Sequence, residues 1–509
     1  MPAQTAPALT ITVPGRLTPA QLRHAAGPLE IRLADGVRDR VAANRAYMMR
    51  CLAEGRPIYG ASTGFGPLVV HAGRADDVDQ SESILAHLSA GQGPDLEPGT
   101  VRAMMLVRLH SLTRGHSGAS TATIDALIAA LRTPLVPAVP RLGSVGASGD
   151  LIPLAHMVQA LKGSDGAHAY IGAEHLPAAQ ALRRLGLPPL RPDGRDGLAL
   201  VNGTSLTAAT AGLAVAELDR SHAIAAVLTC VLVDVLGAAP TFLAPQLLEA
   251  FGHPEVAEVG ERMRALLAGS RPSGLRALQE PYSLRCTPQL LGPARSHLDH
   301  ARQVITRDLN SISDNPLFFP GADVIAHGGN FFSQPAAFAA DVLVMVATQL
   351  GNLAERQLDL LVDPHRNTGL PALLAADPGR QHGVAGVQLA ATALVADMRR
   401  RVIPISSQSL PTNLHNQDIV PLGTLAAQTA WEVTRSLRLL HGSLAVALRQ
   451  AVHLGARPTA PACTAIVDAL MEAIPPIDPD RPLHGDVRRA ADLLDEITAE
   501  HHDEDPLRT

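Results

Sequence analysis

Cysteine is scarce in this chain of 509 residues. Its four cysteines lie far apart, and no two of them form a CxxC pair (Cys51, Cys230, Cys286 and Cys463). We therefore expect neither a disulfide scaffold nor a zinc site, and this usage is typical of the reducing cytoplasm. The first residues, 1–5, also lack the charged segment and apolar run of a secretory signal, which agrees with a cytoplasmic location.

Aromatic residues make up only 3% of the chain, and positive charge is not in excess. The net charge is −6, the isoelectric point is near 6.4, and no basic stripe with interleaved aromatic residues is present, so we expect no nucleic-acid partner. Hydrophobic residues reach 46% and are mostly Ala, Leu and Val, while charged residues reach 18%. This balance favours long, closely packed helices over sheets.

Long apolar runs without charge are also missing. Three long apolar patterns cover residues 205–236, 336–361 and 423–454, and each contains charged residues (Glu217, Asp219, Arg220 and Asp234; Glu355 and Arg356; Glu432 and Arg435). The core of a helix bundle explains them better than membrane spans do. We expect a mostly α fold, an elongated bundle of long helices, with no membrane partner.

The chain divides by pattern into three consecutive regions. Residues 1–200 form an N-terminal region, 201–480 a central bundle of long helices, and 481–509 a C-terminal helix with a tail expected to be disordered from Glu500 onward.

The stretch from Gly143 to Asp150, Gly-Ser-Val-Gly-Ala-Ser-Gly-Asp, precedes an apolar helical pattern. In Ala147-Ser148-Gly149, the Gly149 nitrogen is free of side-chain crowding and could attack the Ala147 carbonyl. Loss of two waters, one involving the Ser148 hydroxyl, would leave an electrophilic methylidene-imidazolone ring. A phosphate-binding loop at a helix N-terminus is the alternative. Against that alternative, no Gly-Lys-Ser/Thr ending follows, and Asp150, a plausible helix N-cap, places negative charge where phosphate would bind.

A second glycine-rich stretch, residues 58–67, holds three glycines and one proline, which predicts a loop. Its tyrosine, Tyr59, lies either on an ordinary surface loop or on a lid that delivers a phenol to a site. Further along, His87 falls in a predicted helix over 81–89, where a single histidine is more often a core or capping residue than a ligand.

Five polar clusters interrupt the predicted helices. They are Leu200-Val-Asn202-Gly-Thr204, Pro281-Tyr282-Ser-Leu-Arg285-Cys286, Ser313-Asp-Asn315-Pro316, His327-Gly-Gly-Asn-Phe331 and Asn413-Leu-His-Asn-Gln417-Asp418. Each cluster alone is typical of a helix cap or a turn.

Together with Ala147-Ser148-Gly149, and in this order, the clusters closely resemble the histidine/aromatic amino-acid ammonia-lyase and aminomutase family over residues 20–475. The segment 143–150 is highly specific to that family, and Tyr59-Gly-x-x-Thr63-Gly-Phe-Gly66 is nearly so. The resemblance implies the fumarase/aspartase-like architecture of these enzymes, a homotetramer whose active sites draw residues from more than one chain. It also implies that Ala147-Ser148-Gly149 cyclises to 4-methylidene-imidazol-5-one (MIO), so that no external cofactor or metal is required.

The resemblance also implies the site residues. Tyr59 would be the general base, Arg285 would bind the substrate carboxylate, and Asn202 and Tyr282 would orient the amine, the MIO oxygen and the carboxylate. The expected substrate-binding residues are Gly66, His87, Leu88, Asn315, Phe331, Asn413 and Gln417. The substrate would be a small aromatic amino acid, whose amine the electrophile turns into a better leaving group.

Two positions bear on the substrate. The pair His87-Leu88 resembles that of tyrosine-preferring members, whereas phenylalanine-preferring members tend to Phe-Leu and histidine-preferring ones to Ser-His. Gln417 stands where histidine lyases usually carry Glu. These residues predict an ammonia-lyase that converts L-tyrosine to trans-4-coumarate; a phenylalanine ammonia-lyase or a tyrosine 2,3-aminomutase giving β-tyrosine stays open, and a histidine ammonia-lyase less so.

The chain also departs from the family pattern. Ile152 replaces a common Ala and Phe332 a common His or Met, so both are expected to change the bulk near the site. A helical scaffold without activity, in which the motif residues serve only as caps, is the alternative outside enzymes.

Overall fold

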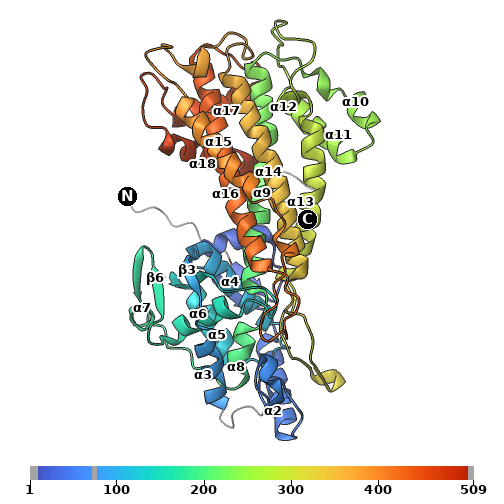
Figure 1. The fold of residues 1–509 in the computed structure, drawn as a ribbon, viewed down its shortest axis with the longest axis vertical. Helices are drawn as coiled ribbons and strands as arrows, with labels where there is room; N and C mark the ends of the chain where they lie inside the picture. Colours follow the sequence, from blue (N-terminus) through green and yellow to red (C-terminus); the bar gives the residue numbers. More distant parts are fainter. Residues whose placement is uncertain (1–9, 72–76, 503–509) are drawn as a thin grey trace. The chain divides into compact units, whose positions relative to one another are not determined.

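Helices dominate the computed structural model, which describes residues 10–71 and 77–502. They hold 59% of the residues, so the mostly α prediction is confirmed (Figure 1). The chain forms two compact units: unit 1 comprises Met1–Ala216, Arg302–Asp341 and Pro404–Gln428, and unit 2 comprises Glu217–Ala301, Val342–Ile403 and Thr429–Thr509. These are not the three consecutive regions expected from the sequence, because the chain returns to unit 1 twice.

Four long helices each contribute one part to each unit. They are α9 (Ser205–Val235), α13 (Thr287–Leu309), α14 (Gln334–Val362) and α16 (Gly423–His453). Three of them confirm the apolar patterns over 205–236, 336–361 and 423–454. In α14 the residues at helical spacing, Leu343, Val346, Leu350 and Leu353, are all buried, as a helix with one apolar face requires.

Unit 1 combines short helices with very short strands. Its own helices are α1 (Pro19–Leu22), α2 (Val37–Ala53), α3 (Asp77–Leu88), α4 (Pro98–Leu112), α5 (Thr121–Leu131), α6 (Leu151–Lys162), α7 (Ala178–Arg184) and α8 (Arg195–Val201). Its strands are β1 (Thr10–Val13), β2 (Glu30–Leu33), β3 (Gln92–Asp95), β4 (Leu135–Pro137), β5 (Pro140–Leu142), β6 (His168–Ile171), β7 (Glu174–Pro177), β8 (Leu317–Phe319) and β9 (Val324–Ala326). Strands β1 and β2 pair in parallel, and the other described pairs are antiparallel: β3 with β5, β8 with β9, and the order β4-β6-β7.

Unit 2 is a helix bundle. The long helices run beside α11 (Pro254–Leu266), α15 (Ala385–Arg400) and α17 (Pro461–Ala473) (Figure 1). Unit 2 also contains α12 (Tyr282–Arg285), α18 (His484–His502) and α10 (Pro245–Ala250), which packs on α11. Small residues let the helices approach closely: a Cβ at Gly351 would lie 2.8 Å from the Met398 methyl group of α15, and one at Gly442 would lie 2.2 Å from the Val487 carbonyl of α18.

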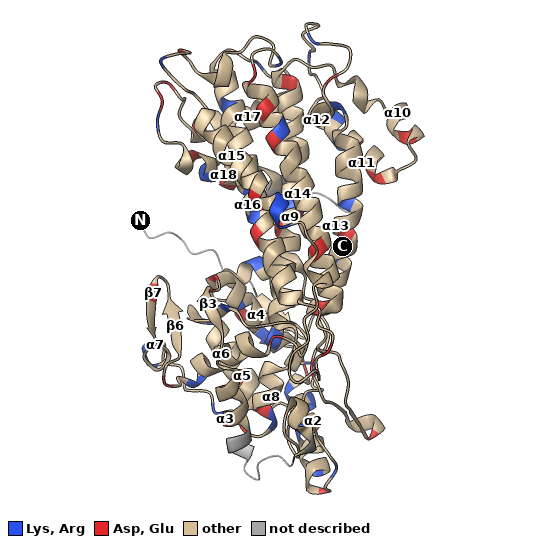
Figure 2. Cartoon of the chain, viewed as in Figure 1, with Lys and Arg blue, Asp and Glu red and all other residues tan. Residues whose placement is uncertain are grey.

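The charges that interrupt α9 are paired inside unit 2. Glu217 pairs with Arg220, Arg295 Nη1 lies 2.9 Å from Asp219, and Asp234 accepts the Thr459 N–H over 2.7 Å. Figure 2 shows acidic and basic residues interspersed along the helices, which agrees with the absence of a basic stripe from the sequence. The segments Arg195–Val235 and Gln334–Val362 are long and apolar enough to cross a membrane, and the most apolar windows are 100% and 67% buried.

The C-terminal helix extends further than expected. Helix α18 continues through His502, so residues 500–502 are helical, and the remainder of the tail lies outside the described residues.

Candidate active site

The stretch 143–150 forms a tight turn between β5 and α6. Gly146 and Gly149 have φ angles of 68° and 74°, a region that favours glycine. A Cβ at Gly149 would lie 2.5 Å from the Gly203 nitrogen and oxygen. The Ala147 side chain is buried against Val420 and Leu422. Both glycines are therefore required by space and by conformation.

Asp150 occupies the N-cap position of α6, but its side chain does not cap the helix as the sequence suggested. The fully buried carboxylate instead accepts hydrogen bonds from Ser144 Oγ (2.9 Å), Thr207 N and Oγ1 (both 2.9 Å) and Thr424 Oγ1 (2.7 Å). Burial raises the pKa of Asp150, and these hydrogen bonds oppose the shift.

Two of the hydroxyl residues around Asp150, Thr207 and Thr424, were not predicted from the sequence. Thr207 and Thr424 fall in the first turns of α9 and α16, where small polar residues look like ordinary helix starts. Their separation from Asp150 is 57 and 274 residues, so only the fold brings them to it.

A cavity of about 540 Å³ in unit 1 opens onto the turn. It gathers eleven of the predicted site residues: Tyr59, Gly66, His87, Leu88, Ser148, Gly149, Asn202, Asn315, Phe331, Asn413 and Gln417. The lining also includes side chains that were not singled out as site residues, among them Phe65, Ile84 and Leu198.

The two residues expected to add bulk are separated. Ile152 lines this cavity, whereas Phe332 lines a different cavity of about 410 Å³ with Arg114 and Asp308. Phe332 therefore does not change the bulk of the cavity that opens onto Ser148, although its neighbour Phe331 lines that cavity.

Two side-chain amides hold Ser148. Gln417 Nε2 donates to Ser148 Oγ over 2.7 Å, and Asn202 Nδ2 lies 3.5 Å from the Ser148 carbonyl oxygen. Asn202 Oδ1 is buried and has no hydrogen-bond partner among the described residues. The hydroxyl and the carbonyl oxygen of Ser148 thus face groups able to bind them, in a turn whose Gly149 position excludes any side chain. These residues fit an MIO group.

The Gln417 amide is presented by a narrow turn. Thr412 and Gln417 exchange backbone hydrogen bonds of 3.0 and 3.3 Å, and Asn416 N donates to Asn413 O over 3.1 Å. The left-handed φ of 56° at Asn413 suits an asparagine. This closed geometry turns both Asn413 and Gln417 toward one cavity.

Tyr59 lies in a loop that folds back on itself. The Gly66 N–H donates to Tyr59 Oη over 2.7 Å, and the Tyr59 ring meets Phe65 edge-on with centroids 6.2 Å apart. A Cβ at Gly66 would lie 2.7 Å from Asn413 Nδ2, so glycine lets the loop close against the 412–417 turn. The loop thus holds the Tyr59 hydroxyl at the cavity through its own backbone.

His87 ends α3 with a defined tautomer. Its Nδ1 lies 3.0 Å from the Ser83 carbonyl oxygen, which can only accept, so Nδ1 carries the proton. In the neutral ring Nε2 is then a hydrogen-bond acceptor.

Tyr282 and Arg285 do not line this cavity. They lie in α12 of unit 2, where the Arg285 guanidinium stacks over the Tyr282 ring at 4.7 Å. Both line a separate cavity of about 490 Å³, and 71% of Tyr282 is exposed.

Among residues 10–71 and 77–502, no group of three or more His, Cys, Asp or Glu side chains could hold a metal ion. All four cysteines are free thiols, and three of them are buried.

Known proteins resemble this chain along nearly its whole length. The model of the aromatic amino acid lyase family matches residues 17–473. A tyrosine ammonia-lyase of Cereibacter sphaeroides is 40% identical, covering 92% of this chain and 94% of that protein. A histidine ammonia-lyase of Symbiobacterium thermophilum is 37% identical, covering 93% and 94%. The crystal structure of a tyrosine aminomutase from Streptomyces globisporus superposes with a TM-score of 0.89 at 30% identity, covering 97% of this chain and 98% of that one.

Proposed function

We propose that this chain, which belongs to the aromatic amino acid lyase family and is a carbon–nitrogen lyase, removes ammonia from L-tyrosine to give trans-4-coumarate. The observation that carries the choice of tyrosine is His87. Its Nδ1 proton is engaged by Ser83, so Nε2 accepts a hydrogen bond from a phenolic hydroxyl. A site built for that bond rejects substrates that lack it.

The proposed electrophile is an MIO group formed from Ala147-Ser148-Gly149 with loss of two waters. Gly149 supplies the attacking nitrogen and Ser148 the hydroxyl that is lost. The buried turn and the Gln417 amide on Ser148 Oγ support this assignment. When formed, the group supplies an electrophile that makes the substrate amine a better leaving group.

Tyr59 is the proposed base for the β-proton. The Gly66 N–H on its Oη would stabilise the phenolate before the transfer, and Tyr59 would keep the proton after it. Asn202 would bind the Ser148 carbonyl oxygen, where negative charge develops. Asn315, Phe331 and Asn413 would position the substrate, with Leu88 against the ring.

Arg285 and Tyr282 would come from another copy of the chain. The family resemblance implies a homotetramer with shared active sites, and Arg285 has the planar fork that binds a carboxylate in two bonds. We place this assembly in the cytoplasm, consistent with the scarce, unpaired cysteines.

A tyrosine aminomutase is the second candidate, because the solved aminomutase structure matches the fold at a TM-score of 0.89. It would use the same residues and return the amine to the β-carbon. A histidine substrate is disfavoured by Gln417, a neutral amide where an imidazole would call for a carboxylate. Phenylalanine would leave the His87 acceptor without a partner.

The experiment is a panel of L-tyrosine, L-phenylalanine, L-histidine and L-DOPA, followed by the ultraviolet absorbance of the arylacrylate products. The proposal expects the highest kcat/KM for L-tyrosine, with coumarate and ammonia in equal amounts. Accumulation of β-tyrosine in place of coumarate would make the protein an aminomutase, and a preference for another amino acid would contradict the assignment of His87.

A further inference from the structure

An irregular segment, residues 270–281, leads into α12 and carries no apolar anchor. Leu275 and Leu278 are 79% and 95% exposed, so they add no packing. Its buried side chains are charged: Arg276 and Glu280 keep only 12% and 6% of their side-chain surface exposed. Polar contacts therefore hold this segment in place.

Arg276 holds Glu280 in a two-pronged ion pair. Its Nε and Nη2 lie 2.5 and 2.6 Å from the two carboxylate oxygens of Glu280. A paired geometry of this kind uses both oxygens of the carboxylate.

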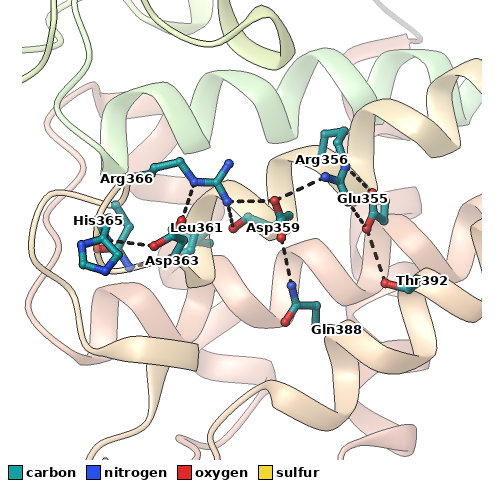
Figure 3. A network of polar contacts seen from close by, with 10 residues as sticks. Glu355, Arg356, Asp359, Leu361, Asp363, His365, Arg366, Gln388 and Thr392 are labelled. Atoms are coloured by element: carbon teal, nitrogen blue, oxygen red, sulfur yellow. Dashed lines mark hydrogen bonds and ion pairs between the residues drawn. The ribbon is translucent and has the colours of Figure 1, made fainter.

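The remaining nitrogen of Arg276 reaches a second element. Nη1 donates to the Arg366 carbonyl oxygen over 2.8 Å and to Thr368 Oγ1 over 3.1 Å. That turn is itself fixed, because the Arg366 guanidinium bonds to Asp363 Oδ2 (2.6 Å) and Asp359 Oδ2 (2.8 Å), as Figure 3 shows. Arg276 is therefore bonded both to Glu280 and to a turn that has its own ion pairs.

Glu280 and Arg285 line the same cavity. Helix α12 follows Glu280 in the sequence and ends at Arg285, and Gln357 holds it in place: Gln357 Nε2 donates to the Ser283 carbonyl oxygen over 2.9 Å. The Arg285 guanidinium has no ion-pair partner within 4.0 Å in the part of the chain that the structure describes, where only the Tyr282 ring stacks on it. If Arg276 did not hold it, the Glu280 carboxylate, which is only five residues away in sequence, could pair with the Arg285 guanidinium in place of another carboxylate.

We propose that Arg276 is a positioning residue that keeps the Glu280 carboxylate away from Arg285, and so leaves Arg285 available to the carboxylate of the substrate. The inference rests on the proposed function, in which Arg285 binds that carboxylate. Without Arg276, Glu280 competes with the substrate and also repels it.

The test measures binding without turnover. In full-length protein carrying Ser148→Ala, calorimetry gives the affinity for L-tyrosine and for tyramine, which has the same phenol and amine but no carboxylate. Adding Arg276→Gln is expected to weaken L-tyrosine about tenfold, the value of one charge-assisted contact, and to leave tyramine unchanged. Adding Glu280→Gln to that variant is expected to restore most of the affinity.

Arg295 offers a matched control. The side chain of Arg295, like that of Arg276, is 12% exposed, and it makes a two-pronged contact with the carboxylate four residues later, Asp299. Arg295 lies in α13, however, and does not line the cavity. Arg295→Gln is expected to lower the melting temperature comparably and to leave both affinities unchanged. Arg276→Lys keeps a cation beside Glu280 but loses the two-pronged contact. It is expected to weaken L-tyrosine binding less than Arg276→Gln does and to leave tyramine unchanged, and it serves as the test variant if Arg276→Gln fails to fold.

Equal weakening for L-tyrosine and tyramine, or no recovery in the double variant, would overturn the inference and leave Arg276 a purely structural residue. A tenfold loss in Arg276→Lys would overturn it as well. If the Ser148→Ala parent binds none of the four aromatic or imidazole amino acids of the panel, the proposed function fails instead, whatever Arg276 does.

Discussion

The side-chain amide of Gln417 donates a hydrogen bond of 2.7 Å to the hydroxyl of Ser148, across 269 residues of sequence. The bond joins the turn that precedes α16 to the turn that precedes α6. It places a neutral donor on the oxygen that the proposed cyclisation removes. This part of the site is thus assembled from two turns that each precede a helix, the short α6 and the long α16.

Replacing His87 by Phe is expected to exchange the substrate preference. The variant loses the Nε2 acceptor and gains an apolar edge, so the ratio of kcat/KM for tyrosine over phenylalanine should fall at least about 100-fold. His253→Phe, at a site outside the cavity, is the control and should keep the ratio of the parent. An unchanged ratio in His87→Phe would remove the basis for choosing tyrosine.

Replacing Tyr59 by Phe is expected to lower kcat about 100-fold or more while KM changes little, since a general base acts in the transition state. The ring contact with Phe65 survives, because only the hydroxyl is lost. Activity within about threefold of the parent would show that another group takes the proton.

Asp308 predicts a pH dependence of stability. Burial raises its pKa to about 6, above the value of about 4 for an unfolded chain. The stability contributed by the protonated form is therefore complete below pH 4 and is lost as the pH rises through 6. Asp308→Asn should exceed the parent in free energy of unfolding by at most about 3 kcal/mol at pH 7.5, and the gain should vanish near pH 4.

Thermal or denaturant unfolding of the parent and of Asp308→Asn at both pH values measures this difference. If Asp308→Asn raised the free energy of unfolding by the same amount at pH 4 and at pH 7.5, the charged Asp308 carboxylate would not be destabilised by burial, and the prediction would be wrong.

The proposed sharing of active sites between chains predicts complementation between inactive variants. Ser148→Ala and Arg285→Gln should each be inactive alone. When the two are co-expressed, random mixing in a tetramer should restore about a quarter of the sites, because each needs one intact residue from each kind of chain. No recovery in mixed tetramers, verified by mass spectrometry of the assembly, would place both residues in the same chain.

Periodicity predicted three of the four long helices, all except α13. The ends of the apolar patterns over 336–361 and 423–454 lie within two residues of the ends of α14 and α16. The agreement is close because a helix with one buried face shows a regular spacing of apolar residues along its own sequence. The cavity residues around Ser148 came from the family resemblance, because each polar cluster alone is typical of a helix cap or a turn.

Contacts between distant segments were not predictable in the same way. The role of Asp150 depends on Thr207 and Thr424, and nothing local distinguishes its carboxylate from an ordinary N-cap. Phe331 and Phe332 are adjacent in an irregular segment that has no hydrophobic periodicity. The sequence therefore could not predict that the two residues line different cavities. The two units are discontinuous in sequence for the same reason, since the chain returns through residues 302–341 and 404–428.

The most direct test is the intact mass of the purified, denatured protein, with Ser148→Ala as the reference. We expect a mass lower than that of the translated sequence by two water molecules, with the loss confined to a peptide that contains Ala147-Ser148-Gly149, and no loss in Ser148→Ala. A parent protein that has the full mass of its sequence, and yet releases coumarate from L-tyrosine, would contradict the proposed electrophile.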